Sequence, residues 1–425
     1  MKKTTTAALN LAKVPVRGSD LRGYTRLAVD ATLALTRLVE TMHHNITRMP
    51  SVLGKATQQP TRGVTGFVYK SVRGITRLAG GSIDALLGSM APSIGAGQSS
   101  PYREAVLAAL NGVLGDHLSE TSNPLAIPMS LRRGGQSLTL TRKSLSAAIP
   151  SPAGRILLLV HGLCMSDLQW RRNGHDHGAA LAADLGFTPL YLHYNSGRHI
   201  STNGREFAEF IEALLHAWPV AVDELAIIGH SMGGLVARSA CRYGAESGQA
   251  WLRHVSNIFF LGTPHLGAPL ERAGSWIDAI LDASPYSMAF ARLGKIRSAG
   301  ITDLRRGGLC DADWHGRDRF VRSQRYPQHV PLPRGIACHA FAASLGSASG
   351  TIIDRSIGDG LVPLDSALGQ SKNTDRRLLF LKARRWIGYR MNHLDLLDCK
   401  EVYERIRREL DGTRSGSARL RAGRE

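Results

Sequence analysis

One serine of this sequence stands in a pattern that gives it the chemistry of a nucleophile. The segment 229–233, Gly-His-Ser-Met-Gly, matches G-x-S-x-G, follows the apolar residues 225–228 and opens a helical stretch. A strand, a tight turn and a helix in this order raise a serine hydroxyl above a sheet, and the turn requires glycines because the backbones come close. The alternative is a glycine-rich turn with a helix-capping serine. The strand before the motif and the helix after it favour Ser231 as a nucleophile.

A serine hydroxyl needs a base to accept its proton and a carboxylate to orient that base. On a fold built from strand, turn and helix units, the acid and then the histidine follow the serine along the chain. Asp359 lies between two glycines in a predicted loop, and His393 lies between a strand-like stretch and a C-terminal helix. We therefore predict the catalytic triad Ser231, Asp359 and His393.

Other carboxylates and histidines compete for these two roles. Asp354 and Asp365 flank Asp359, which is preferred because its neighbouring glycines let the backbone bring the carboxylate close to the base. Three other histidines are less suited, because two come too early in the chain and one lies inside a predicted strand: His161, His265 and His339.

The tetrahedral intermediate of acyl transfer carries an oxyanion that backbone N–H groups must stabilise. One donor is expected from Met232, directly after the nucleophile. The other is expected from Leu163, because His161-Gly162-Leu163 ends the predicted strand 156–160. The alternative for this second segment is an ordinary strand-ending turn.

The elements that must position these residues follow from short apolar stretches separated by helical ones. Strands are predicted at 138–141, 156–160, 189–192, 225–228, 258–261 and 336–343, and the clearest helix at about 203–216. This alternation predicts the α/β class, with a mostly parallel sheet and helices on both faces. The long segment before the last of these strands predicts a lid or cap over an apolar site, at about 270–335.

The first hundred residues differ from the rest in charge and pattern. The 425-residue chain carries a formal charge of +19, of which residues 1–99 supply +9 from 13 basic and 4 acidic residues. Amphipathic helices are predicted at 20–46 and about 64–88, and the phrase Arg-Gly-x-Thr-Arg-Leu-Ala occurs in both. Basic helices of this kind favour an anionic membrane surface as partner, and packing on other parts of the protein is the alternative. Aromatic residues make up 6% and no zinc-finger or RNP-like pattern occurs, so we expect no nucleic-acid partner.

Four regions are predicted along the chain. They are a basic amphipathic helical region (1–99), a connecting helix and linker (100–135) whose helix begins at Pro101, an α/β catalytic domain (136–410) and a disordered basic tail (411–425). No stretch approaches the roughly 18 apolar residues of a membrane-spanning helix. The five cysteines are scattered without a C-x-x-C pair, which favours a reducing compartment over a disulfide framework. Without a convincing export signal, we expect a cytoplasmic protein at the inner membrane face.

Five ordered motifs resemble those of one family. They are His161-Gly162-Leu163 and the segments 229–236, 262–269, 358–362 and 391–395. Over about residues 150–405 the sequence looks like the α/β-hydrolase lipases of the GPI inositol-deacylase-like group, and its last two motifs also resemble bacterial triacylglycerol lipases. The resemblance implies the α/β-hydrolase fold and hydrolysis of acyl esters through Ser231, Asp359 and His393.

The same resemblance raises the question of a metal. The bacterial lipases bind calcium through an aspartate two residues beyond the catalytic histidine, where this sequence has Asp395. No second carboxylate occurs in a matching motif, and N-capping of the terminal helix is the preferred role of Asp395. We therefore expect neither a metal nor a cofactor.

Together these observations predict a serine esterase or lipase whose lid favours an apolar, lipid-like acyl chain. Acyl transfer to an alcohol on the same triad stays open as a mechanistic neighbour. A membrane-associated interaction protein with a vestigial hydrolase domain is the alternative from another class, and the presence of all three triad residue types argues against it.

Overall fold

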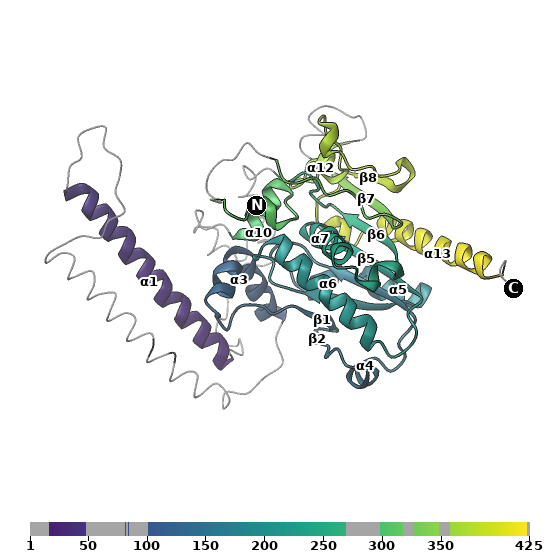
Figure 1. Cartoon of the computed structure of the whole chain (residues 1–425), viewed down its shortest axis with the longest axis horizontal. Helices are drawn as coiled ribbons and strands as arrows, with labels where there is room; N and C mark the ends of the chain where they lie inside the picture. Colours follow the sequence, from purple (N-terminus) through teal and green to yellow (C-terminus); the bar gives the residue numbers. More distant parts are fainter. Residues whose placement is uncertain are drawn as a thin grey trace, which may run out of the picture. The chain divides into compact units, whose positions relative to one another are not determined.

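The computed structural model describes residues 17–47, 81, 84, 101–268, 298–317, 326–347 and 358–422. The chain divides into two units (Figure 1). The smaller consists of Met1–Arg103 with Leu118–Ala126, and the larger of Glu104–His117 with Ile127–Glu425. Residues 104–117 and 127–135, which the sequence analysis assigned to a connecting segment, thus lie in the larger unit.

The larger unit is built on an eight-stranded sheet in the order β2-β1-β4-β3-β5-β6-β7-β8. The strands are β1 (Ser130–Arg133), β2 (Gln136–Ser137), β3 (Arg155–Val160), β4 (Thr188–His193), β5 (Glu224–His230), β6 (Val255–Leu261), β7 (Ala337–Ser344) and β8 (Arg385–Tyr389). The neighbouring strands β4, β3, β5, β6, β7 and β8 are all parallel to one another. Strand β1 is antiparallel to both β2 and β4. The predicted mostly parallel sheet is confirmed.

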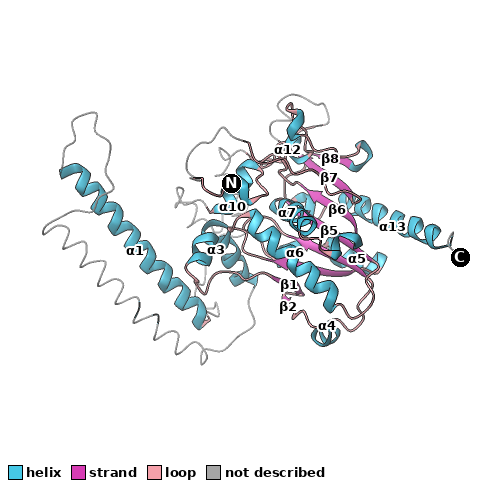
Figure 2. Cartoon of the chain, in the orientation of Figure 1, coloured by secondary structure: helices cyan, strands magenta, loops and turns pink. Residues whose placement is uncertain are grey.

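Helices cover both faces of this sheet (Figure 2). The helices described from residue 101 onward are α3 (Pro101–Glu120), α4 (Arg142–Ala148), α5 (His177–Leu185), α6 (Ile200–Ala217), α7 (Met232–Glu246), α10 (Ala299–Arg306), α12 (Leu364–Ala367) and α13 (Lys400–Ala422). Short 3-10 turns lie at Asp167–Trp170, Ala250–His254, Asp311–Asp313, Thr374–Arg376, Lys382–Arg384 and Asp395–Leu397.

The strands are apolar on both sides because both sides are buried. One face packs against α5 and α13 through alternate residues, among them Leu157, Leu159, Ile228, Phe259, Leu181 and Val402. The intervening residues are buried on the opposite face, where α7 lies against β3 and β5 and α6 lies against α7. This double cover fixes the carboxyl ends of the parallel strands, where the site forms.

Most predicted elements occur with shifted ends, and one strand is wrong. The predicted helix 203–216 is part of α6, and Pro101 begins α3 as expected. Residues 138–141, predicted as a strand, lead instead into α4, because the Thr141 side chain accepts a hydrogen bond from the Ser144 N–H and caps that helix. Strand β1 was not foreseen.

The predicted disordered tail is also wrong as far as Ala422, because α13 continues to that residue. The helix is anchored by Val402, Ile406 and Leu410, which are fully buried. Once a helix is nucleated and packed, each added residue gains a hydrogen bond at little further cost, so polar residues can extend it.

The predicted lid at 270–335 lies outside the described residues except for 298–317 and 326–335, which include α10. Of the second predicted amphipathic segment, 64–88, only Gly81 and Asp84 are described.

The smaller unit contains α1 (Gly18–Thr47), which matches the predicted helix 20–46. The Asp84 carboxylate accepts hydrogen bonds from Arg22 at 2.7 Å and Arg26 at 2.5 Å, so this residue is bonded to α1. These bonds hold the pKa of Asp84 well below its usual range. Among the described residues, no helix is long and apolar enough to cross a membrane.

Candidate active site

The predicted nucleophile lies on a strained turn between β5 and α7. Ser231 has φ 55° and ψ −123°, a conformation that non-glycine residues rarely adopt, and its N–H donates to Leu261 O at 2.8 Å. A Cβ on Gly233 would lie 2.1 Å from the Val160 carbonyl oxygen, so this position requires glycine. The Ser231 hydroxyl is buried and has no hydrogen-bond partner among the described residues, which leaves it available for chemistry.

The predicted acid and base are in direct contact. His393 Nδ1 lies 2.6 Å from Asp359 Oδ2, and both side chains are buried. The other carboxylate oxygen, Asp359 Oδ1, accepts hydrogen bonds from the N–H groups of Leu361 at 2.9 Å and Val362 at 2.7 Å. These two bonds fix the carboxylate and leave Oδ2 to orient the imidazole.

The acid–base pair and the serine meet at the carboxyl ends of β5 and β6. Gly262 follows the residue that accepts the Ser231 N–H, and a Cβ on it would lie 3.0 Å from His393 Nδ1. His230, next to the serine, has its ring centroid 4.7 Å from that of His393. The structure therefore brings the three predicted triad residues to the same end of the sheet, without a hydrogen bond between Ser231 Oγ and His393 Nε2.

The predicted oxyanion loop lies against the same serine. A Cβ on Gly162 would lie 3.0 Å from Ser231 Cβ, so the loop passes very close to the nucleophile. The Tyr194 hydroxyl donates to His161 O at 2.8 Å, and the two rings stack. Leu163 and Met232 are both buried. Both expected backbone donors thus lie on segments that touch or adjoin the serine.

Buried histidines keep the surroundings of the triad uncharged. Burial lowers the pKa of His161 to about 3, and burial together with the charge of His393 lowers that of His230 well below its usual value. Both rings are therefore neutral near pH 7. A neutral, dry environment strengthens the electrostatic interactions that the oxyanion would make.

The competing residues are placed away from these roles. Asp365 is exposed in the first turn of α12, and Asp354 lies outside the described residues. His339 lies in β7, as predicted, and its Nε2 is hydrogen-bonded to Asn257 at 2.9 Å. His265 Nδ1 lies 3.2 Å from Arg238 Nη1.

Asp395 does not cap the terminal helix, so that prediction is wrong. Helix α13 begins five residues later, at Lys400, while Asp395 Oδ2 accepts the Asn392 N–H at 2.7 Å. The Asn392 side chain in turn accepts the Leu394 N–H at 2.9 Å. These reciprocal bonds close a tight turn around His393, and the side chain of Asp395 serves that turn.

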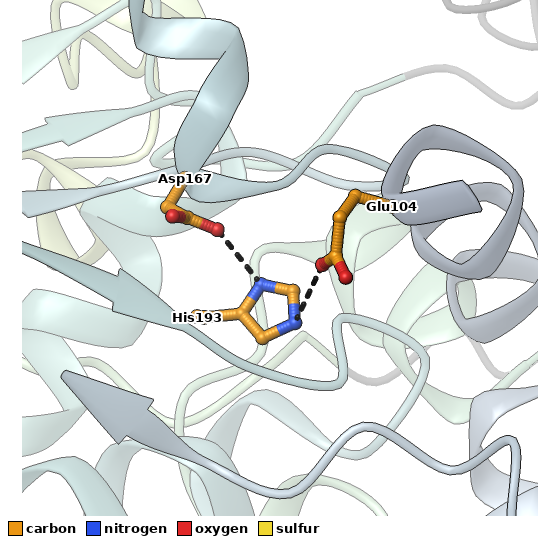
Figure 3. A group of neighbouring side chains, drawn as sticks. All are labelled: Glu104, Asp167 and His193. Atoms are coloured by element: carbon orange, nitrogen blue, oxygen red, sulfur yellow. Dashed lines mark ion pairs between the residues drawn. The ribbon is translucent and has the colours of Figure 1, made fainter. Parts of the chain in front are cut away.

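A buried polar group that the sequence analysis missed lies near the oxyanion loop, because the ring centroids of His161 and His193 are 6.2 Å apart. Figure 3 shows its members, Glu104, Asp167 and His193. His193 is placed between two carboxylates, with Nδ1 3.2 Å from Asp167 and Nε2 3.7 Å from Glu104. Asp167 comes four residues after Leu163. No sequence signal marks this group, because its members are single charged residues on separate elements.

The donor atoms of Glu104, Asp167 and His193 lie within 4.8 Å of one another, close enough to hold a metal ion. However, Arg132 Nη1 lies 2.8 Å from Glu104 and 3.1 Å from Asp167. A guanidinium therefore takes the place of a cation between the two carboxylates, and a second cation there would be repelled. The residues present fit a metal poorly, and no catalytic step is assigned to one.

Part of the chain matches a known protein family. Residues 151–331 match the PGAP1-like alpha/beta domain family. The resemblance to the GPI inositol-deacylase-like group of α/β hydrolases is thereby confirmed over these residues, and the α/β-hydrolase fold with it. At the level of the family, this supports a serine hydrolase.

Similar solved structures are distant in sequence. The mature Bacillus licheniformis lipase BlEst2 is 16% identical, with a TM-score of 0.36 over 58% of this chain and 88% of that one. Aspergillus fumigatus lipase B is 10% identical, with a TM-score of 0.36 over 63% and 57%, and EstA from Clostridium botulinum is 13% identical, with 0.35 over 62% and 90%. No curated protein matches the chain.

Proposed function

We propose that the protein is a serine hydrolase that cleaves carboxylic acyl esters, with lipid-like esters as its substrate class. The observation that carries this proposal is the 2.6 Å contact of His393 with Asp359, next to a serine held on a strained, glycine-flanked turn. A buried acid–base pair beside a buried serine hydroxyl is the arrangement that acyl transfer requires. The lipid-like substrate rests on the predicted apolar lid at 270–335.

In the proposed mechanism Ser231 Oγ attacks the ester carbonyl carbon while His393 Nε2 takes the hydroxyl proton. Asp359 holds the Nδ1–H tautomer and stabilises the imidazolium that forms. The N–H groups of Met232 and Leu163 bind the oxyanion of the tetrahedral intermediate. When the intermediate collapses, the alkoxide leaves with the proton from His393, and water then hydrolyses the acyl-enzyme by the same two steps.

The first test replaces the nucleophile. Ser231→Ala should lower hydrolysis of p-nitrophenyl esters by about 10⁴-fold or more and abolish labelling by a fluorophosphonate. Ser247→Ala, at an exposed serine at the end of α7, is the matched control and should behave as the wild type. A series of graded acyl lengths measures whether long chains are preferred. Undiminished labelling of Ser231→Ala would overturn the assignment.

The second test separates the acid from its neighbour. Asp359→Asn should lower the rate by about 10³- to 10⁴-fold, because the asparagine cannot stabilise the imidazolium. Asp365→Asn, at the exposed carboxylate of α12, should leave the rate unchanged. The opposite ranking of the two variants would show that the acid is misassigned.

Two alternatives make different predictions in the same assays. An acyltransferase would form the acyl-enzyme but yield more ester than free acid when an alcohol is added to the reaction. A vestigial domain in an interaction protein would give neither turnover nor labelling at Ser231.

We further propose that the region 1–99 contacts an anionic membrane surface. Leu21 and Tyr24 of α1 are 46% and 37% exposed, which leaves apolar side chains available to lipid. Because Arg22 and Arg26 are engaged by Asp84, the attraction would have to come from other basic residues of this region. Sedimentation with vesicles tests this: binding should rise with anionic lipid, fall with salt and disappear on deletion of 1–99. Equal binding by full-length and truncated proteins would refute it.

A further inference from the structure

A small cavity beside helix α7 is lined by five basic side chains. They are Arg238, His265, Arg306, His329 and Arg376, here called the Arg238 cluster. They come from α7, the loop after β6, the end of α10, residues 327–330 and the 3-10 turn at Thr374–Arg376. None of the described residues that line the cavity is acidic, and none of them belongs to the proposed triad.

The central arginine of this cluster lacks a counter-charge. Arg238 is 3% exposed, and no ion pair joins it to a carboxylate of the described residues. Its guanidinium donates to Val330 O, while its Nε is buried without a hydrogen-bond partner there. Burial lowers the pKa of Arg238 to about 10, partly offset by three nearby cysteines. A buried cation without compensation is costly, so a negative charge is expected to complete the site.

The histidine next to it offers a second unused donor. His265 Nδ1 lies 3.2 Å from Arg238 Nη1, and because a guanidinium only donates, Nδ1 must be the acceptor. The proton of the neutral ring is then on Nε2, which is buried and has no hydrogen-bond partner among the described residues. Burial and the charge of Arg238 both lower the pKa of His265. The atoms left over are therefore donors, which suits an anion.

The rim of the cavity adds a cation that is already positioned. Arg376 stacks over Tyr326 at 4.2 Å and makes a long hydrogen bond to Leu266 O at 3.4 Å. The cavity has a volume of about 30 Å³, where about 10–15 Å³ on the same measure holds one water molecule. It therefore has room for a small anionic group and not for a whole lipid or nucleotide.

We propose that the Arg238 cluster binds a phosphate group, supplied either by free phosphate or by the phosphomonoester headgroup of a lipid. Guanidinium groups match the geometry and charge of phosphate oxygens, and the two unused donors of Arg238 and His265 supply further contacts. His265 lies three residues after Gly262, which directly follows β6, and a Cβ on Gly262 would lie 2.9 Å from the His393 ring. A bound phosphate would thus lie on a loop that begins beside the proposed catalytic histidine.

Calorimetric titration of the full chain with inorganic phosphate tests the site. Binding should be saturable, and acetate at equal ionic strength should not replace it. Arg376→Gln should weaken binding about tenfold, the loss expected for one charge-assisted hydrogen bond, while Arg377→Gln should leave it within about twofold of the wild type. Arg377 is the matched control because it is exposed and donates to Ser371 O instead.

Two further arms separate the ligand source and the proposed hydrolase function. Phosphatidylcholine vesicles with phosphatidic acid should bind through Arg376, in competition with inorganic phosphate, if a lipid headgroup is the ligand. If free phosphate is the ligand, vesicle binding is the same for both arginine variants. Ser231→Ala should bind phosphate as the wild type does, so a failed hydrolase assignment would not affect this result. Absence of saturable binding, or equal weakening by Arg376→Gln and Arg377→Gln, would overturn the proposal.

Discussion

Two arginines of the larger unit, the half-buried Arg132 and the buried Arg238, differ in what compensates their charge. Arg132 lies within 3.1 Å of two carboxylates, those of Glu104 and Asp167, beside His193; these four residues are called the Arg132 cluster. Arg238 has a histidine and a carbonyl oxygen as its partners and no carboxylate among the described residues. The first arrangement holds its counter-charge within the fold and is structural. The second leaves two buried donors, Arg238 Nε and His265 Nε2, without hydrogen-bond partners among the described residues, as expected of an anion-binding site.

The largest effect is expected from breaking the compensated cluster. Arg132→Met removes the guanidinium that lies between two buried carboxylates and should lower the free energy of unfolding by about 3–5 kcal/mol. Arg133→Met is the control, because Arg133 is exposed and bonded only weakly to Ala148 O at 3.3 Å. Urea unfolding of both variants measures the difference. Equal stability of the two would mean that the Arg132 cluster carries no structural charge compensation.

Acid should act on the neutral buried histidines before it reaches the carboxylates of the Arg132 cluster. The folded pKa of His161 is about 3, whereas an unfolded histidine titrates at about 6.5, so the unfolded chain alone takes up this proton in between. The contribution of His161 to the free energy of unfolding is therefore fully present above about pH 6.5 and decreases as the pH is lowered. At pH 5 the loss from this residue is about 2 kcal/mol.

Asp167 behaves differently in the same titration. Burial raises its pKa, but the hydrogen bond and charge of His193 and the charge of Arg132 outweigh this and leave the pKa below its usual value. Its contribution is present above about pH 4 and is lost only below that. The free energy of unfolding, measured from pH 7 to 5, should thus change less steeply with pH in His161→Asn than in the wild type. His216→Asn, at an exposed histidine, should show the same pH dependence as the wild type. A slope that survives His161→Asn would assign the loss to other groups.

The contrast between motif residues and charged clusters explains what the sequence could predict. Ser231, Asp359 and His393 were selected by glycine neighbours and chain order, which are local features, and the structure places Asp359 and His393 in contact. The parallel sheet was predictable because buried strands read as apolar runs.

The clusters of Arg132 and Arg238 were not predictable in this way. Each gathers single charged residues from separate elements, and only the folded topology brings them together. The turn role of Asp395 was missed for a related reason, since it depends on where α13 begins. Local sequence carries the chemistry of a motif, whereas charge compensation is a property of the tertiary structure.

A smaller effect is expected from removing the uncompensated arginine. Arg238→Met loses the bonds to Val330 and His265 but also removes a buried cation, so stability in phosphate-free buffer should change by no more than about 1 kcal/mol. Phosphate should stabilise the wild type, by about 2.7 kcal/mol at a hundredfold excess over its Kd, and should not stabilise this variant. A loss comparable to that of Arg132→Met without phosphate would show that Arg238 is compensated within the protein.

The smallest effect is expected from chelation. EDTA should change the free energy of unfolding, and also the activation free energy of ester hydrolysis, by less than about 0.5 kcal/mol. This is within the range of neutral surface substitutions. The reason lies in the Arg132 cluster, where the guanidinium already occupies the place between Glu104 and Asp167, and in Asp395, whose carboxylate is bonded to the Asn392 N–H. Zn²⁺ should accordingly stabilise Arg132→Met, which removes the guanidinium from between Glu104 and Asp167, more than it stabilises the wild type. A loss of activity on chelation that Ca²⁺ restores would contradict this view and assign Asp395 to a metal site.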